Sequence, residues 1–420
     1  MNQKFEAQFK EAGFTKLAPI QEAVYPLLAA GKDVLGLAPT GSGKTLAYSW
    51  PLLESLLPGD GVQLLILAPS QELAAQLTDV IRPWAKLLNL NVTSVIGGAN
   101  VKRQVEKLKK RPEVVVGTPG RLLSLANDKK LKLHTLTSIV IDEADELLGQ
   151  EQTLTTCREL VSKAPAETQL AFFSATKSQI LDELHKWFGV EVTVVDVRQQ
   201  DHTQGEVTHY LIETPTRKRV EALRKLANID GFYGLVFFKQ AATLKDVAEK
   251  LRHHHVPLAT LSSEQRQVDR QAALRALRKR EIRLLLTTDL AARGLDIKEL
   301  PAVVNYDLPH SHNTYVHRVG RTGRMGAKGM VVNLGNEHDL RLFKQLIRKE
   351  AYHFMTAYLY EGQIVTELPE KSSPKVRKPK KASKSVQAVT EKVRKHKKKR
   401  KRDQKNKGKR RTKWKSSQLQ

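Results

Sequence analysis

Ten short apolar runs rich in Val, Ile and Leu recur along the chain, with helical patterns between them. The first set is Val34–Leu37, Leu64–Ala68, Val114–Gly117, Ser138–Ile141 and Leu170–Phe173. The second set is Gly234–Phe238, Leu258–Leu261, Leu284–Thr288, Ala302–Tyr306 and Met330–Leu334. Near-continuous apolar strands that alternate with helices are typical of parallel sheets covered on both faces. The pattern therefore predicts an α/β chain with two similar domains in tandem.

A polar stretch, Arg198–Glu206, has no apolar periodicity and is predicted to be the linker. The predicted domains are residues 1–200 and 207–362. Residues 371–420 hold 23 Lys or Arg against two acidic residues, and so carry +21 of the chain's net +27. Such a segment cannot bury a core, so we predict a disordered tail that binds a polyanion, with RNA as the expected partner. A solubilising or nuclear-targeting tail is the alternative.

Composition limits the other possibilities. Cys157 is the only cysteine, so it cannot form an internal disulfide, and we interpret it as a packing or surface residue. The sequence shows no signal-peptide pattern and no apolar window of about 20 residues, which favours a cytoplasmic protein without a membrane span. The tract His253–His255 follows a helical pattern, and we interpret it as a solvated turn rather than a metal site. Nothing in the sequence demands an oligomer.

The string A-P-T-G-S-G-K-T, Ala38–Thr45, follows the first apolar run. A loop between a strand and a helix N-terminus presents backbone N–H groups to a phosphate. We expect residues 40–43 (Thr40, Gly41, Ser42 and Gly43) to form this cradle. Lys44 would supply a charge to the β- and γ-phosphates, and Thr45 a hydroxyl ligand for Mg²⁺. The alternative is a Gly-rich turn without a ligand.

The string D-E-A-D, Asp142–Asp145, follows a buried strand, so it lies at the carboxyl edge where open α/β sheets bind ligands. Asp142 suits a contact with Mg²⁺, and Glu143 suits polarising an attacking water. An exposed acidic turn at a helix start is the alternative. The presence of the phosphate loop favours the catalytic interpretation.

A third string, H-R-V-G-R-T-G-R, covers His317–Arg324. On a helix, residues three apart share a face, so Arg321 and Arg324 are predicted to converge on one anion. They would then stabilise charge across a cleft between the domains. A solvated basic face is the alternative.

These three strings, in this order, resemble the DEAD-box ATP-dependent RNA helicases of helicase superfamily 2. The resemblance covers residues 12–345, and it implies two RecA-like P-loop domains. Further matching strings are Gly13–Gln21, Gly97–Gly98, Thr118–Arg121, Ser174–Thr176, Val236–Phe238, Gln267–Arg270 and Thr288–Asp296.

The resemblance implies ATP and Mg²⁺ as cofactors and assigns roles to residues. Gln21 would read the adenine, Asp296 would hold the ribose, and Arg321 and Arg324 would reach the γ-phosphate. The implied catalytic residues are Lys44, Asp142, Glu143, Arg321 and Arg324. The residues implied to couple hydrolysis to domain closure are Ser174, Thr176 and His317. The implied contacts to the RNA backbone are Gly98, Thr118, Gly120, Arg121, Arg270 and Thr288.

The chain also departs from the family pattern. Gln71 stands where the family has an arginine near the RNA, and Ser262–Ser263 replaces His-Gly. Ala18 replaces a Thr or Ser in the adenine-reading segment. The family's upstream aromatic would lie before the first printed residue, and Phe5 and Phe9 are interpreted as packing residues. We therefore expect weak adenine stacking.

The hypothesis is an RNA-dependent ATPase that unwinds short duplexes or remodels RNA–protein complexes, largely without regard to sequence. The alternatives are an ATP-gated RNA clamp or RNA chaperone with little unwinding, and a DNA helicase or translocase. A compact core with a basic tail is similar to the short bacterial members of the family. That resemblance suggests ribosomal RNA, pre-ribosomal particles and ribosome assembly as the setting.

Overall fold

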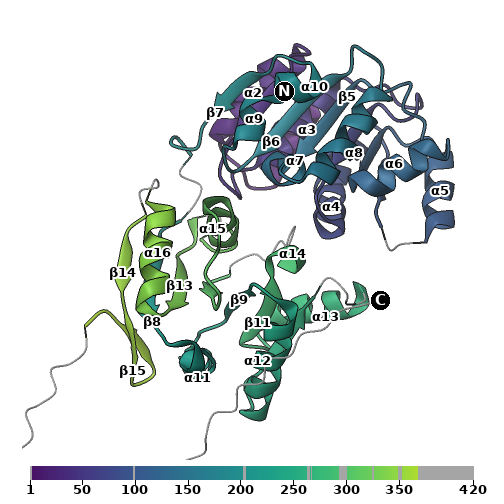
Figure 1. Ribbon diagram of the computed structural model, residues 1–420. Coiled ribbons are helices and arrows are strands. Elements are labelled where there is room, and N and C mark those ends of the chain that lie inside the picture. The colour runs from purple at the N-terminus through teal and green to yellow at the C-terminus, as the bar shows by residue number, and fades with distance from the viewer. Residues whose placement is uncertain are drawn as a thin grey trace, which may run out of the picture. The chain divides into compact units, whose positions relative to one another are not determined.

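The computed structural model describes residues 2–97, 100–201, 205–262, 265, 267–292, 300–323, 326–348 and 352–367 (Figure 1). These residues hold two seven-stranded parallel sheets and a two-stranded antiparallel hairpin. The prediction of an α/β chain with two parallel sheets in tandem is confirmed. The predicted tail lies outside the described residues.

The first sheet has the strand order β3-β4-β2-β5-β6-β1-β7. Its strands are β1 Val34–Leu37, β2 Leu64–Leu67, β3 Val92–Val95, β4 Val114–Gly117, β5 Ser138–Asp142, β6 Gln169–Ser174 and β7 Thr193–Asp196. Alternate strand residues enter different cores, as Leu64 and Ile66 do on one face and Leu65 and Leu67 on the other. Both faces of the sheet are therefore buried, which explains why its central strands are apolar along most of their length.

Helices cover the two faces of this sheet in chain order. The helices that pack on the first face are α1 Gln3–Glu11, α2 Pro19–Ala29, α3 Lys44–Glu54 and α4 Gln71–Leu87. The second face is covered by α5 Val101–Lys109, α6 Pro119–Asn127, α7 Ala144–Leu148, α8 Glu151–Ser162, α9 Gln179–Asp182 and α10 Leu184–Phe188. We call this sheet and its helices the first lobe.

The second sheet repeats the arrangement in the order β10-β11-β9-β12-β13-β8-β14. Its strands are β8 Val207–Glu213, β9 Gly234–Phe238, β10 Leu258–Leu261, β11 Leu284–Thr288, β12 Ala302–Asn305, β13 Gly329–Gly335 and β14 Phe354–Thr356. The flanking elements are η1 Thr216–Lys218, α11 Arg219–Ala227, α12 Ala241–His253, α13 Gln267–Arg278, α14 Asp289–Ala292, α15 His312–Val319, α16 Glu337–Ile347 and the hairpin β15 Tyr358–Tyr360 with β16 Gln363–Val365. We call this group the second lobe.

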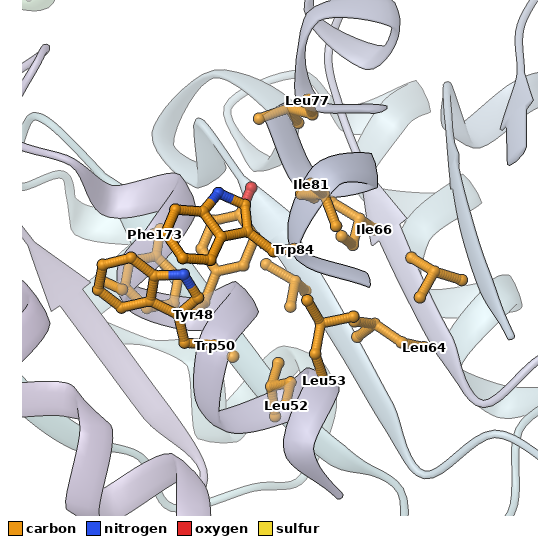
Figure 2. Packing of buried hydrophobic residues seen from close by; sticks show 14 of the residues in the cluster. Tyr48, Trp50, Leu52, Leu53, Leu64, Ile66, Leu77, Ile81, Trp84 and Phe173 are labelled. Carbon is orange, nitrogen blue, oxygen red and sulfur yellow. The ribbon is translucent and has the colours of Figure 1, made fainter. Parts of the chain in front are cut away.

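Aromatic side chains fill the first face of the first lobe. Figure 2 shows Trp50 of α3 and Trp84 of α4 against each other, and their ring centroids lie 5.0 Å apart. Phe5 packs edge-on against Trp84 at 5.7 Å, and Phe9 packs edge-on against Trp50 at the same distance. Burying such rings contributes about 1.5–3 kcal/mol each. Phe5 and Phe9 are packing residues, as predicted.

All ten predicted strands are present, and four strands in the two sheets lie outside the predicted set: β3, β7, β8 and β14. The strand β3 reads V-T-S-V, and β7 at the edge of the sheet has three exposed residues out of four. Edge strands are covered on fewer sides and therefore carry polar residues. The described residues of the predicted linker contain no helix or strand.

Candidate functional site

The phosphate loop lies between β1 and α3, as predicted. Gly41 and Gly43 have φ angles of +90° and +84°, in the left-handed region that side chains disfavour. Gly43 is the N-cap of α3, so the helix begins at Lys44. Thr40 and Ser42 complete the loop. Its backbone therefore has the turn that aims N–H groups and a helix N-terminus at one point.

Side chains inside the loop fit a phosphate ligand. Lys44 Nζ donates to the carbonyl oxygens of Ala38 and Pro39 at 2.7 and 2.9 Å, so the ammonium group lies within the loop. Ser42 Oγ is buried and has no hydrogen-bond partner among the described residues. A buried polar atom left unpaired costs about 1–3 kcal/mol, which a bound phosphate would recover.

The two predicted catalytic carboxylates lie together at the carboxyl end of β5. Asp142 is the last residue of that strand and is 4% exposed. Glu143 follows with a φ of +49°, a strained conformation for a residue with a side chain, which costs about 1–3 kcal/mol. Glu143 Oε2 is buried, and no residue in the described part of the chain hydrogen-bonds it. Strain and an orphaned acceptor at one residue are typical of a reactive site.

Burial and the charge of Glu143 raise the pKa of Asp142 to about 6, although Lys44 and a hydrogen bond from Tyr48 oppose the shift. Tyr48 Oη donates to Asp142 Oδ2 at 3.0 Å, and its hydroxyl also hydrogen-bonds the Thr45 side chain. Tyr48 therefore joins the two residues predicted to hold Mg²⁺. These oxygens suit a hard cation.

Sequence reasoning missed Tyr48, although a signal was present. Tyr48 lies four residues after Lys44, one turn along the helix that leaves the phosphate loop, so its side chain shares a face with Lys44.

Asp145, the last residue of the D-E-A-D string, connects to the S-A-T segment at the end of β6. Thr176 Oγ1 donates to Asp145 Oδ2, and Ser174 Oγ donates to the Thr176 carbonyl at 2.7 Å. The backbone N–H of Ala38 donates to the Ser174 carbonyl at 3.1 Å. The predicted coupling residues Ser174 and Thr176 thus contact both the carboxylate segment and the phosphate loop.

His317 of α15 donates from Nε2 to Asp145 Oδ2 at 2.9 Å. Burial lowers the pKa of His317, but the hydrogen bond and charge of Asp145, with the charges of Glu143 and Glu146, outweigh it, and the pKa is raised. The pKa of Asp145 is lowered, because the same pairing outweighs its burial. His317 is therefore attached to the D-E-A-D string.

Arg321 also lies near this string, with Nη2 3.9 Å from Glu143 Oε1. The prediction placed Arg321 and Arg324 on one helix face, and for Arg321 it is wrong. Helix α15 ends at Val319 and Gly323 has a φ of +67°, so Arg321 lies in a turn beyond the helix. Arg324 lies outside the described residues.

Arg318 belongs to the interior of the second lobe. Its guanidinium donates to both Asp289 oxygens at 2.6 and 2.7 Å, and to Asn305 Oδ1 and the Asp307 carbonyl at 2.7 Å each. With 2% of its surface exposed it is neither a phosphate ligand nor part of a solvated face. The open alternative of a solvated basic face is thus wrong for this residue.

Gln21 lies against the phosphate loop. Its Oε1 accepts from Ala18 N at 2.9 Å, and its Nε2 donates to the Gly43 carbonyl at 3.3 Å. An amide offers two N–H groups and two lone pairs on its oxygen, so one of each remains to meet an adenine edge. Asp296, the predicted ribose ligand, lies outside the described residues.

The predicted RNA-contacting residues occupy several places. Thr118 is the N-cap of α6, and Gly120 and Arg121 lie in the first turn of that helix. The hydroxyl of Thr288, at the end of β11, accepts from Ala291 N at 3.4 Å. Gly98 lies outside the described residues.

Arg270 is buried rather than presented to a ligand. Its guanidinium donates to the carbonyls of Ser262 and Ala291 at 2.8 and 3.0 Å, and Nε lies 2.9 Å from Glu72 Oε1 of α4. Glu72, the glutamate of P-S-Q-E-L-A, was also missed by sequence reasoning. Its place next to the unusual Gln71 was the available signal.

Two further interpretations from sequence are supported. Cys157 is buried within α8, and burial raises the pKa of its thiol to about 12, which suits packing and not nucleophilic chemistry. His253, His254 and His255 are exposed at the end of α12, as expected of a solvated turn.

Comparison with known proteins identifies the family. Residues 18–184 match the DEAD/DEAH box helicase family, and residues 218–326 match the helicase conserved C-terminal domain. The chain is 40% identical over 362 residues to "Probable ATP-dependent RNA helicase YfmL" of Bacillus subtilis, covering 86% of this chain and 96% of that protein. It is 36% identical to the DEAD-box ATP-dependent RNA helicase CshC of Bacillus cereus, covering 88% and 95%.

Solved structures agree. The S. cerevisiae Dbp5 structure bound to RNA and ADP BeF3 superimposes with a TM-score of 0.76 at 25% identity, covering 85% of this chain and 94% of that one. Mss116p bound to ssRNA and AMP-PNP shares the fold with a TM-score of 0.73 at 23% identity, covering 85% and 77%. This chain belongs to the DEAD-box family of ATP-dependent RNA helicases. Among its described helices, none is long and apolar enough to cross a membrane.

Proposed function

We propose that this chain hydrolyses ATP in response to RNA, and uses the cycle to separate short duplexes or to remodel RNA–protein complexes. The observation that carries the proposal is the junction at the D-E-A-D string. There the Asp142–Glu143 pair adjoins the phosphate loop, while Arg321 and His317 of the second lobe lie 3.9 and 2.9 Å from Glu143 and Asp145. Chemistry on the first lobe is thereby tied to the position of the second.

The proposed residue roles combine this geometry with the family resemblance, and those of Asp296 and Arg324 rest on the resemblance alone. Residues 40–43 cradle the phosphates, with Gln21 selecting adenine and Asp296 holding the ribose. Glu143 orients the attacking water, and Lys44 and Arg321, with Arg324, offset the charge that develops on the transferred phosphoryl group. Bound Mg²⁺, held by Thr45 and Asp142, would neutralise phosphate charge.

Coupling between ATP and RNA is proposed to run through Ser174, Thr176 and His317. Because Asp145 binds both Thr176 and His317, loss of either contact would weaken the attachment of the second lobe to the site. Two ligands that favour the same closed state must strengthen each other's binding by the same factor. RNA should therefore tighten ATP binding, and ATP should tighten RNA binding.

RNA is proposed to bind along Gly98, Thr118, Gly120, Arg121 and Thr288 through its backbone, with little sequence preference. Arg270 uses its donors on two carbonyls and pairs with Glu72, so RNA contact by this residue would require some of these bonds to exchange. The two RNA-bound structures similar to this chain support RNA as the partner.

A second candidate is an ATP-gated RNA clamp whose slow hydrolysis only times release. It is favoured by Gln71, a neutral amide at a position where the family has a cation. The Gln71 amide packs closely against Gly97, because a Cβ added to Gly97 would lie 3.1 Å from Gln71 Nε2. With fewer cations in contact with the RNA backbone, the protein would hold the RNA less tightly and would separate a duplex less effectively. Ribosomal RNA as the substrate, a cytoplasmic location and a tethering role for residues 371–420 are further proposals.

The test is steady-state ATP turnover without nucleic acid, with single-stranded RNA and with matched DNA, together with a strand-displacement assay. Stimulation by RNA alone, with ATP-dependent release of a strand, is the expected result. RNA stimulation without strand release would select the clamp. Equal stimulation by DNA, or none by either, would overturn the proposal.

A further inference from the structure

The first lobe contains a cavity of about 410 Å³ at the edge of the sheet opposite the catalytic residues. Three segments line it, and each directly precedes a strand: residues 60–62 before β2, residues 108–111 before β4, and residues 129–135 before β5. The phosphate loop and Asp142 follow the other ends of strands. With four or five residues per strand at about 3.3 Å each, the two edges are roughly 13–16 Å apart.

The inner wall of the cavity is apolar. Val62, Leu108 and Leu131 line it and are buried, and Val105 of α5 is partly buried beside Leu108. An opening of this size with an apolar wall can accept a large aliphatic or aromatic side chain of a ligand.

The rim of the cavity is cationic. Five Lys or Arg residues line it against one acid, Asp60. Lys109 pairs with Glu106 at 2.7 Å, whereas Arg111, Lys130 and Lys132 form no ion pair with any described residue. Unpaired cations around an apolar wall attract an anionic ligand and set its orientation.

The basic side chains before β5 alternate with buried leucines. Lys130, Lys132 and His134 are exposed and alternate with Leu131 and Leu133, which are 3% and 5% exposed. Lys130, Lys132 and His134 all line the cavity, so the three basic groups share its rim. Leu131 is anchored by its N–H donating to the Leu125 carbonyl at 3.0 Å, so α6 fixes the segment.

We propose that this cavity binds a short acidic segment of a partner protein, with an apolar side chain in the cavity and carboxylates against Arg111, Lys130 and Lys132. Single-stranded RNA fits less well, because the lining contains no Phe, Tyr or Trp on which a base could stack. The chain's own residues 371–420 carry +21 and would be repelled. The site leaves the catalytic edge open, and the inference does not depend on the proposed function.

The test uses the full chain and a photo-reactive peptide, five Asp or Glu residues around one benzoylphenylalanine, with cross-links mapped by mass spectrometry. The double substitution Lys130→Glu with Lys132→Glu reverses two exposed rim charges. Its matched control is Lys102→Glu with Lys107→Glu, two exposed positions of α5 outside the lining that change the net charge equally.

Cross-links concentrated in residues 105–111 and 129–135 are expected. The rim variant should lower them at least tenfold and the control by less than twofold. Cross-links confined to residues 371–420, or equal losses in both variants, would reduce the effect to net charge and overturn the proposal. Displacement of the peptide from residues 105–135 by a 12-nucleotide RNA at equal concentration would identify a nucleic-acid surface instead, and would also overturn it.

Discussion

The two sheets have the same topology, but the phosphate loop and the D-E-A-D string both lie at strand ends of the first sheet. When the strands of each sheet are written in spatial order, every strand number in the second sheet equals the number at the same place in the first sheet plus seven. After β1 the chain forms the phosphate loop, whereas after the matching β8 it forms the short η1. The strand β5 ends at Asp142, with Glu143 next in the chain, whereas the matching β12 ends at Asn305, and Asp307 lies two residues further on. A common scaffold therefore does not fix the chemistry; the loops at the strand ends do.

The polar groups at the matching ends are used differently. In the first lobe, Ser42 Oγ and Glu143 Oε2 are buried and have no hydrogen-bond partner in the part of the chain that the structure describes. In the second lobe, Asp307 pairs with Arg219 at 3.4 Å and accepts from Lys239 N at 3.0 Å, while Asn305 accepts from Arg318. The polar oxygens at the strand ends of the first lobe are thus available to a ligand, whereas those of the second lobe bind other residues of the same lobe.

The largest expected effect comes from Glu143→Gln. Removing the carboxylate that is proposed to orient water should lower RNA-stimulated ATP turnover by roughly 10²–10⁴-fold, the range for a general base, while nucleotide binding persists. The matched change is Asp307→Asn at the corresponding strand end, which should lower the melting temperature and leave the turnover of folded protein within a few-fold. Similar turnover losses in both variants would remove the distinction between the lobes.

Arg318→Ala should destabilise the second lobe. It would leave Asp289, Asn305 and the Asp307 carbonyl without their cation, and breaking a buried pair by removing one partner costs about 3–5 kcal/mol. Urea unfolding measures the effect. The control is Arg224→Ala, which breaks an exposed pair with Glu221 and should cost far less, because solvent screens exposed ion pairs. Equal losses of unfolding free energy in the two variants would show that the hydrogen bonds of Arg318 do not stabilise the second lobe.

Acid should weaken Mg²⁺-dependent nucleotide binding. The pKa of Asp142 is raised to about 6 in the metal-free protein, so the carboxylate is ionised above that pH and protonated below it. Protons then compete with Mg²⁺ for the carboxylate, and the affinity for the nucleotide with Mg²⁺ should fall up to about tenfold for each pH unit below 6.

Tyr48→Phe sharpens this test, because it deletes a hydrogen bond that lowers the pKa of Asp142. The affinity for a fluorescent nucleotide, measured against pH, should begin to fall at a higher pH in this variant. An unchanged pH dependence would mean that another group controls it.

The smallest effect is expected from Gln71→Arg, which restores the cation usual in the family. One added phosphate contact should tighten RNA binding severalfold at low salt and steepen the salt dependence by about one unit. Gln76→Arg, further along α4, is the control for net charge. Equal gains from both substitutions would show that position 71 has no special place on the RNA.

Much of the molecule could be read from the sequence, for local reasons. Strands that are covered on both faces are mostly apolar, and each of the ten predicted apolar runs forms a strand in the structure. The phosphate loop and the D-E-A-D string were readable because glycines at left-handed φ and carboxylates at a strand end are local requirements. The half-exposed strands β3 and β7 lack that signal and were missed.

Only the tertiary structure decided which polar side chains are reserved for a ligand and which hold the fold together. Arg318, Arg321 and Arg270 look alike in the sequence. Arg318 is buried and donates to Asp289, so it has a structural role. Arg321 lies beyond the end of α15 and is close to Glu143. Arg270 forms an ion pair with Glu72 of the first lobe. The role of an arginine depends on which oxygen atoms surround its guanidinium, and those oxygens come from residues distant in the chain.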